Sequence, residues 1–136
     1  MAHRGWRSRA RAATGSRDTI VVDQATLDQA KRFFTSKGLK VAGGITATIN
    51  EANQFETYCY SNPEHRKKIR DVVEFTAKNF DDVILDDFFF TSCKCDLCIR
   101  AKGARSWTRF RLALMDEAGR SLVMQPARAV NPNVKV

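Results

Sequence analysis

Residues 62–87 read NPEHRKKIRDVVEFTAKNFDDVILDD, and this stretch decides the fold class. It opens with a capping asparagine, a proline suited to the first helical position and an acid in the first turn, so it predicts a helix start. The helix is expected to end near Asn79, with an apolar stripe formed by Ile69, Val72, Val73, Ala77 and Phe80. Val83-Ile84-Leu85 follows, and a short, fully apolar run is typical of a strand buried on both faces.

The same pattern recurs on both sides of this stretch. Upstream, a short strand at Thr19–Val22, a helix from Gln24 to Lys37 and a strand at Leu39–Ile45 are expected. Downstream, Ser106 is expected to cap a third helix that Pro126 interrupts, and Val134–Val136 resembles the start of a strand. Residues 46–60 and 88–105 are expected to be loops.

Successive strands lie about 40 residues apart, which is the spacing of parallel strands joined by helices. Such βα units form either open doubly wound sheets or closed barrels. A closed eight-stranded barrel needs roughly 200 residues or more. The 136 residues would therefore supply about half of one, and we expect them alone to be inactive. Uncovered sheet edges and an apolar inner face would favour self-association.

The net charge of +8 is unevenly distributed. Residues 1–17 contain five arginines and no acid, and the remainder has 18 basic against 15 acidic side chains, a net charge of +3. The folded part is therefore too weakly basic to predict nucleic-acid binding. We expect residues 1–17 to be a disordered basic tail and residues 18–136 to form the domain. A mitochondrial transit peptide is the alternative for the tail; otherwise the protein is expected to be cytoplasmic. No apolar run is long enough to cross a membrane.

Two acids follow the predicted strand Val83–Leu85. Ligands bind beyond the carboxyl ends of parallel strands, so Asp86 and Asp87 are candidate catalytic residues, with loop capping as the alternative role. Polar side chains also follow the preceding strand, at the same predicted rim. The candidate substrate-binding residues are Thr46, Asn50, Glu51 and Phe88. The Phe88-Phe89-Phe90 run could offer a stacking surface for a sugar, although three consecutive side chains cannot all face one way.

Four cysteines form the sharpest chemical signal. Cys93, Cys95 and Cys98 lie within six residues of one another, and Cys59 follows the preceding strand on the same rim. Four cysteine thiolates are a common ligand set for structural zinc, which leaves no open position for catalysis. The sequence therefore predicts a zinc site that ties two neighbouring loops together. Reduced thiols without metal are the alternative.

Several motifs in order resemble a known family. These are Gly43-Gly44-Ile45-Thr46, Cys59-Tyr60-Ser61-Asn62-Pro63, the run from Asp86 to Thr91, and the cysteine cluster followed by Lys102-Gly103 and Trp107. Over roughly residues 18–136 they resemble a largely uncharacterised family of glycoside-hydrolase-like proteins of fungi and bacteria. The resemblance implies an α/β fold, namely part of an eight-stranded β/α barrel (a TIM barrel) with three to four parallel βα units.

A looser resemblance concerns the cysteines alone. Some zinc-bearing beta-galactosidases of TIM-barrel fold have one cysteine upstream of a Cys-x-Cys-x-x-Cys cluster, and those four hold a structural zinc. Cys59, Cys93, Cys95 and Cys98 follow the same order, although the gap between Cys59 and Cys93 is shorter. This similarity implies zinc but does not imply beta-galactosidase activity.

Three functions follow as hypotheses. The first is a fragment of a glycoside hydrolase that acts on carbohydrate through paired carboxylates. The second is a zinc-stabilised carbohydrate-binding module without catalysis. The third, a basic nucleic-acid-binding zinc protein, is disfavoured by the small charge of the domain.

Overall fold

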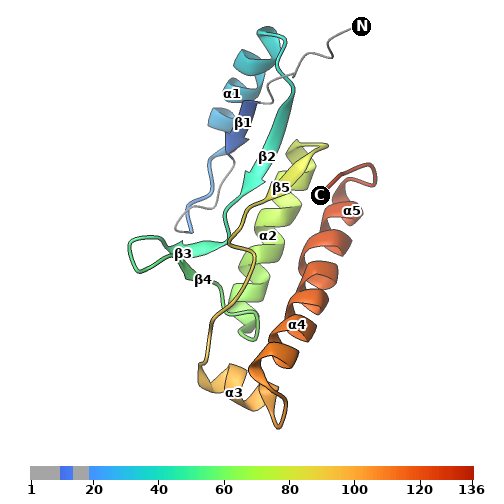
Figure 1. The fold of residues 1–136 in the computed structure, drawn as a ribbon. Coiled ribbons are helices and arrows are strands. Elements are labelled where there is room, and N and C mark those ends of the chain that lie inside the picture. Colours follow the sequence, from blue (N-terminus) through green and yellow to red (C-terminus); the bar gives the residue numbers. More distant parts are fainter. Residues whose placement is uncertain (1–9, 14–18) are drawn as a thin grey trace, which may run out of the picture.

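The computed structural model describes residues 10–13 and 19–136, which form a mixed α/β structure (Figure 1). The strands are β1 (Ala10–Ala13), β2 (Val41–Ile45), β3 (Thr48–Asn50), β4 (Glu56–Thr57) and β5 (Val83–Leu85). β1, β2 and β5 form one parallel sheet in that order, and β3 and β4 form a separate antiparallel hairpin. A parallel bridge between Asp82 and Lys135 adds the last residues of the chain beside β5.

The helical segments are α1 (Gln24–Ser36), α2 (Pro63–Asn79), α3 (Asp96–Lys102), α4 (Trp107–Ala118), the π-helical segment η1 (Gly119–Met124) and α5 (Gln125–Val130). The three long helices α1, α2 and α4 begin where the sequence predicts. Each long helix has a side-chain cap: Asp23 accepts from the Thr26 N–H at 2.9 Å, Asn62 from Glu64 at 2.8 Å, and Ser106 from Arg109 at 3.2 Å. These bonds satisfy amide groups that have no partner inside the helix.

Four local predictions were wrong. The expected loop at residues 46–60 contains the β3–β4 hairpin, and the expected loop at 88–105 contains α3. Thr19–Val22 is not a strand, since Ile20 makes only an isolated bridge. Pro126 does not interrupt the third helix. The wider turns of η1 come just before this proline, which cannot donate a backbone hydrogen bond, and the helix continues past it.

One face of the parallel sheet packs on α2. A Cβ atom added to Gly43 would lie 2.4 Å from Thr76 Cγ2 and 2.7 Å from Phe80 Cδ2, so backbone and helix are in direct contact there. Ile45 and Val83 belong to the same buried cluster as Val73 of α2. Because side chains alternate along a strand, Gly44 and Ile84 face away from α2. The sheet therefore has a helix-covered face and an opposite face, and the latter continues toward Asp86.

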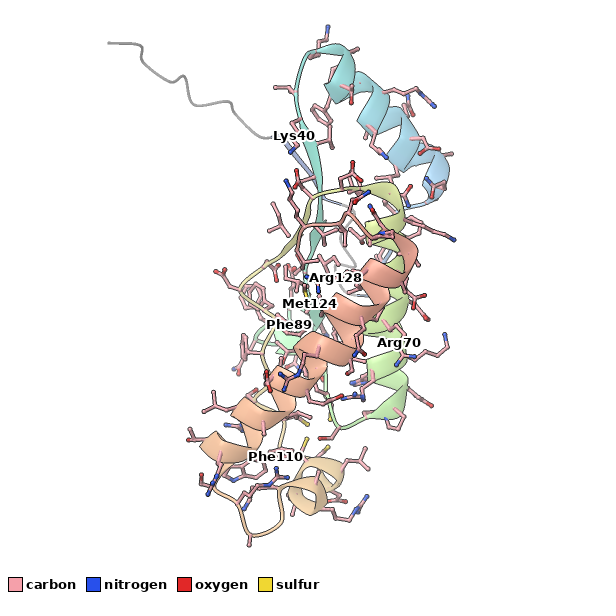
Figure 2. All side chains as sticks on the ribbon, turned by 90° about the vertical axis from the view of Figure 1, so that its right-hand side faces the viewer. Lys40, Arg70, Phe89, Phe110, Met124 and Arg128 are labelled. Atoms are coloured by element: carbon pink, nitrogen blue, oxygen red, sulfur yellow. The ribbon has the colours of Figure 1, made fainter. Side chains whose placement is uncertain are left out.

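The segment α4–η1–α5 forms one long helix that runs beside α2 (Figures 1 and 2). Leu122, Val123 and Ala127 of this segment lie in the core cluster that includes Val73. At one end, the Arg66 guanidinium makes two hydrogen bonds to the Glu117 carboxylate, at 2.9 and 2.7 Å. Two parallel contacts of this kind fix the relative position of the two helices.

The expectation of parallel βα units in an α/β fold is confirmed, but the described residues do not establish a barrel. The predicted tail, residues 1–17, lies outside the described residues except for Ala10–Ala13, which form β1. Within the described residues, no helix combines the length and apolar character needed to cross a membrane.

Candidate functional site

The four cysteine sulfurs converge at the end of the molecule that holds α3. Cys59 follows β4, Cys93 lies in the segment after β5, and Cys95 and Cys98 lie at the start of α3. All four Sγ atoms are within 4.8 Å of one another, and Cys59 Sγ is 3.7 Å from Cys95 Sγ and 3.5 Å from Cys98 Sγ. Sulfurs bound tetrahedrally to zinc at about 2.3 Å lie about 3.8 Å apart, so the arrangement fits a zinc ion.

The surroundings of the four thiols differ. Cys59 and Cys98 are buried, Cys93 is half-buried and Cys95 is exposed. Burial raises the pKa of Cys59 and of Cys93. The pKa of Cys95 is lowered to about 7, chiefly by the backbone N–H of Cys98 one turn into the helix. A thiolate therefore forms first at Cys95, and a bound cation would favour ionisation of the other three.

Three neighbours support the cluster. The Cys59 N–H donates to His65 Nδ1 at 2.9 Å, and the Cys98 thiol lies 3.4 Å from the Ser61 hydroxyl. Burial, with a smaller contribution from Lys68, lowers the pKa of His65 and so favours the neutral ring that this hydrogen bond requires. Phe110 packs against Cys59 and Cys98 from the side of α4. The sequence does not reveal this role of His65, because a contact between a ring and a backbone amide leaves no motif.

Asp86 lies directly after β5. Its N–H donates to the Ile45 carbonyl at 3.2 Å, which extends the pairing of β2 and β5 by one residue. Its Oδ1 accepts from the Phe88 N–H at 3.1 Å, so Asp86 also caps the following loop, the alternative role that the sequence left open. Alternation from Ile84 directs Asp86 toward the face of the sheet opposite α2. Asp87 is exposed and lies in the turn that follows.

A buried tyrosine lies near Asp86. Tyr60 is fully buried, and its hydroxyl has no hydrogen-bond partner among the described residues. Its pKa is raised, first by burial and to a smaller extent by the charges of Tyr58 and Asp86. The Thr48 hydroxyl is likewise buried without a described partner. Such groups are rare in folded proteins and mark a place where water or further polar groups are needed.

The four candidate substrate-binding residues are spread along the rim. Thr46 follows β2 and is half-buried, and Glu51 begins the turn of the β3–β4 hairpin. Asn50 Oδ1 accepts from the Asn53 N–H at 3.2 Å, so this side chain closes the hairpin turn. Phe88 stacks on Phe55, with ring centroids 5.1 Å apart. The structure thus places Phe88 beside an aromatic residue that the sequence analysis did not single out.

Comparison with known proteins gives the family. A family model described as "Probable glycosyl hydrolase, catalytic domain" matches residues 14–136. The chain belongs to this glycosyl hydrolase catalytic-domain family. An uncharacterized protein of Saccharolobus solfataricus is 29% identical over 148 residues, which cover 88% of this chain and 25% of that protein. The chain thus spans about a quarter of the length of this curated relative. No solved structure matches the chain.

Membership of the glycosyl hydrolase family agrees with the resemblance found in the sequence motifs. The family match includes both Asp86 and all four cysteines. It assigns no role to any of these residues.

Proposed function

We propose that the chain is part of a glycoside hydrolase catalytic domain, and that Asp86 is one of two carboxylates that cleave a glycosidic bond. The observation that carries this proposal is the position of Asp86 at the carboxyl end of a parallel strand, on the sheet face opposite α2. In β/α barrels, catalytic side chains occupy this position. The order β1, β2, β5 and then Lys135 is that of consecutive barrel strands, so we propose a TIM barrel for the complete domain.

Asp86 can perform one of two tasks in this reaction. A carboxyl group beside the scissile bond either transfers a proton or attacks the sugar, depending on its distance to the second carboxyl group. The Phe88 N–H holds Oδ1 and thereby fixes the orientation of the carboxylate. Asp87 and Glu51 are the candidates for the second carboxylate within this chain.

The four cysteines have a separate, structural task in the proposal. A zinc ion held by Cys59, Cys93, Cys95 and Cys98 would supply a cross-link with all four positions filled. The ion would connect Cys59, which follows the hairpin, to Cys93, which lies in the segment after β5. This cross-link would stabilise the loops next to Asp86.

Hydrolysis of nitrophenyl glycosides tests the catalytic role. We expect the 136 residues alone to show little turnover, because a closed barrel takes roughly 200 residues or more. In the longest reading frame that contains them, Asp86→Asn should lower kcat by a factor of about 100 or more, since one acid or base contributes about 10²–10⁴. Asp81→Asn, an exposed acid at the opposite end of β5, is the matched control. Full activity of Asp86→Asn would refute the assignment.

Metal analysis tests the zinc site independently of activity. Purified chain should contain one zinc ion, and Cys59→Ser should lose it, because a three-thiolate site binds the ion less tightly. Zinc content that is unchanged in Cys59→Ser, or absent from the unaltered chain after purification with zinc, would contradict the site.

A second candidate is a zinc-stabilised carbohydrate-binding module without catalysis. The exposed aromatic side chains beside the hairpin favour this alternative. It predicts that sugar binding survives in the double variant Asp86→Asn, Asp87→Asn, and that the longest reading frame hydrolyses no glycoside. Loss of all binding in the double variant would exclude it.

A further inference from the structure

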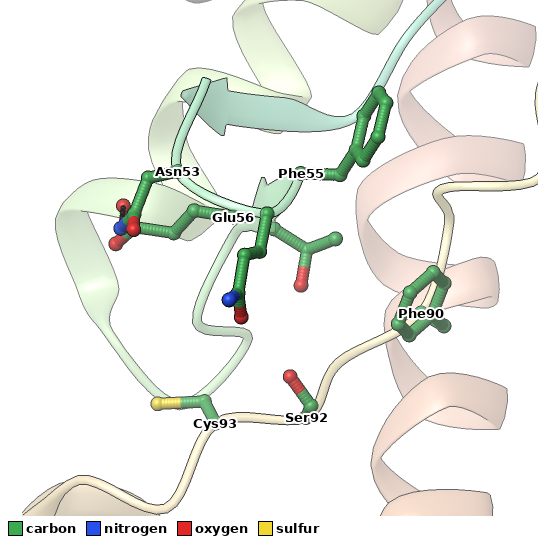
Figure 3. A pocket seen from close by; sticks show the side chains of 8 residues that line it. Asn53, Phe55, Glu56, Phe90, Ser92 and Cys93 are labelled. Atoms are coloured by element: carbon green, nitrogen blue, oxygen red, sulfur yellow. Dashed lines mark hydrogen bonds between the residues drawn. The ribbon is translucent and has the colours of Figure 1, made fainter. Parts of the chain in front are cut away.

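A hollow lies between the β3–β4 hairpin and the segment that follows β5, with a volume of about 510 Å³ (Figure 3). Its lining comes from both sides and comprises Asn53, Gln54, Phe55, Glu56, Thr57, Phe90, Ser92 and Cys93. We propose that this hollow is a subsite for one neutral pyranose ring of the carbohydrate, an inference that rests on the proposed function and extends it to a named substrate-binding site.

One part of the lining is aromatic. Phe55 is 50% exposed and Phe90 is 45% exposed, although large apolar side chains are normally buried. Both stack on Phe88: the centroid distance is 5.1 Å at an interplanar angle of 15° for Phe55, and 6.4 Å at 30° for Phe90. Phe88 therefore holds both rings in place while each keeps exposed surface. The C–H face of a pyranose is apolar and matches such a surface.

The other part of the lining is polar and carries hydrogen-bonding groups suited to hydroxyls. Asn53 Nδ2 donates to Glu56 Oε2 at 3.1 Å, so these two side chains are held together at one side of the hollow (Figure 3). A side-chain amide can both donate to and accept from a sugar hydroxyl, and an ionised carboxylate accepts from one.

The charge of the lining residues indicates which sugars the hollow could bind. Glu56 is the only ionisable carboxylate in the lining, and none of the eight lining residues is lysine or arginine. Phosphorylated sugars and uronic acids would meet a negative charge without a cation to compensate it. The hollow therefore suits an uncharged sugar ring.

The backbone of the hairpin turn adopts an uncommon conformation at Phe55. Gln54 and Phe55 have φ values of 51° and 55°, in the left-handed region that bulky residues rarely adopt. The Phe55 N–H donates to the Glu51 carbonyl at 3.2 Å, and the Glu56 N–H donates to the Asn53 carbonyl at 3.1 Å. Backbone strain of this kind persists only where surrounding contacts enforce it, and it is concentrated at ligand sites.

The opposite wall is held by its own contacts. Arg111 of α4 donates to the Ser92 carbonyl at 3.0 Å, and the Cys93 N–H donates to the Thr91 hydroxyl at 3.2 Å. Cys93 belongs both to the lining and to the four-cysteine cluster. The cluster therefore brings the end of this wall next to Cys59, which follows the hairpin.

Saturation-transfer NMR on the zinc-loaded 136-residue chain tests the subsite, with methyl β-D-glucopyranoside, methyl β-D-galactopyranoside and methyl β-D-mannopyranoside as probes. At least one should receive saturation, strongest at its ring C–H protons. Phe55→Ala should weaken its binding at least tenfold, and Phe55→Trp should retain it. Phe33→Ala, which removes a 58% exposed ring from α1, is the matched control and should bind like the unaltered chain.

The outcomes separate the subsite from the catalytic proposal. Asp86→Asn should leave binding unchanged. If Asp86→Asn abolishes binding while Phe55→Ala does not, the subsite is refuted and the catalytic proposal stands. Absence of saturation for all three probes also refutes the subsite, and glycoside hydrolysis then decides the catalytic proposal separately. If Phe55→Ala changes the amide spectrum beyond the hairpin, Phe55→Leu is used as the test variant instead. Retained sugar binding in Phe55→Leu would refute stacking of the sugar on the Phe55 ring.

Discussion

At the scale of single residues, close contacts make some positions intolerant of small changes. Gly43 has no space for a side chain, because Thr76 and Phe80 of α2 lie against its backbone. A glycine inside a strand often marks a place where another segment approaches closely. The structure identifies α2 as the partner in that approach and Gly43 as the residue that makes it.

Gly43→Ala should destabilise the fold. The added methyl group would force α2 and β2 apart, and overpacking of this kind typically costs about 1–3 kcal/mol. Urea denaturation measures the change. Gly119→Ala is the matched control, because nothing lies within 4 Å of the added Cβ and the backbone is helical, so it should be neutral or stabilising by about 0.5–1 kcal/mol. Equal stability of the two variants would contradict the close contact.

His65 should support the proposed metal site without binding the ion. His65→Ala removes the acceptor for the Cys59 N–H, and loss of such supporting bonds typically weakens metal binding about 10–100-fold. Competition with a coloured chelator measures zinc affinity. Lys68→Ala, an exposed change one helical turn further along α2, should retain the affinity. A complete loss of zinc in His65→Ala would instead indicate that His65 is itself a ligand.

At the scale of elements, α2 and the long helix α4–η1–α5 are joined by a core and by one bidentate ion pair. Arg66 also donates to the Tyr60 carbonyl at 3.1 Å, so the same guanidinium connects both helices to the chain segment beside the four-cysteine cluster. Side-chain exposure is 26% for Arg66 and 49% for Glu117. Solvent screening therefore limits the energy of the pair to the range of surface ion pairs.

The stability of this helix pair should depend on pH in a defined direction. The hydrogen bond from Arg66 is the main cause that lowers the pKa of Glu117 in the folded chain. The stabilisation that the Arg66–Glu117 pair contributes is thus fully present above the pKa of an unfolded glutamate, about 4.3. It is lost as the pH falls through the lower pKa that Glu117 has in the folded chain.

Denaturation at several pH values checks this. Glu117→Gln should lower stability by up to about 1 kcal/mol at pH 7 and reduce the acid dependence. Asp71→Asn, in the exposed Lys67–Asp71 pair on α2, is the control and should have a smaller effect. An acid dependence that is identical in Glu117→Gln and the unaltered chain would exclude the pair as its source.

At the scale of the whole molecule, the described residues form a parallel sheet with helices against one face. In a barrel the opposite face would turn inward, and strand edges would pair with further strands. The 136 residues alone should therefore associate with one another in a concentration-dependent manner. Sedimentation velocity measures this over a range of concentrations. A single monomeric species at all concentrations would contradict the expectation.

Removal of the metal should affect the molecule beyond the cysteines. The cluster joins the segment before α2 to the segment before α4, so chelation should lower the melting temperature and weaken sugar binding in the hollow beside Cys93. Calorimetry before and after chelation checks the first effect, and saturation-transfer NMR the second. Cys59→Ser should reproduce both effects without chelator. A melting temperature that is unchanged by chelation would show that the ion does not support the fold.

The sequence by itself determined the three long helices and two of the parallel strands, β2 and β5, whereas it did not reveal β1 or α3. Periodic apolar positions and capping residues are local signals, so the starts of α1, α2 and α4 and the position of β5 followed from a few neighbouring residues. The four cysteines were predicted to converge because three lie close together and the fourth follows the neighbouring strand at the same rim.

Only the tertiary structure decided which surfaces meet. The left-handed turn at Gln54 and Phe55 contains no glycine, so the sequence does not predict it. The Phe55 ring stacks on Phe88, which is more than 30 residues away in the chain. The support of Cys59 by His65 likewise depends on how the start of α2 returns toward the cysteines. Such contacts arise from the packing of distant segments, and packing has no periodic pattern in the sequence. The four clustered cysteines could therefore be named from the sequence, whereas the walls of the hollow could not.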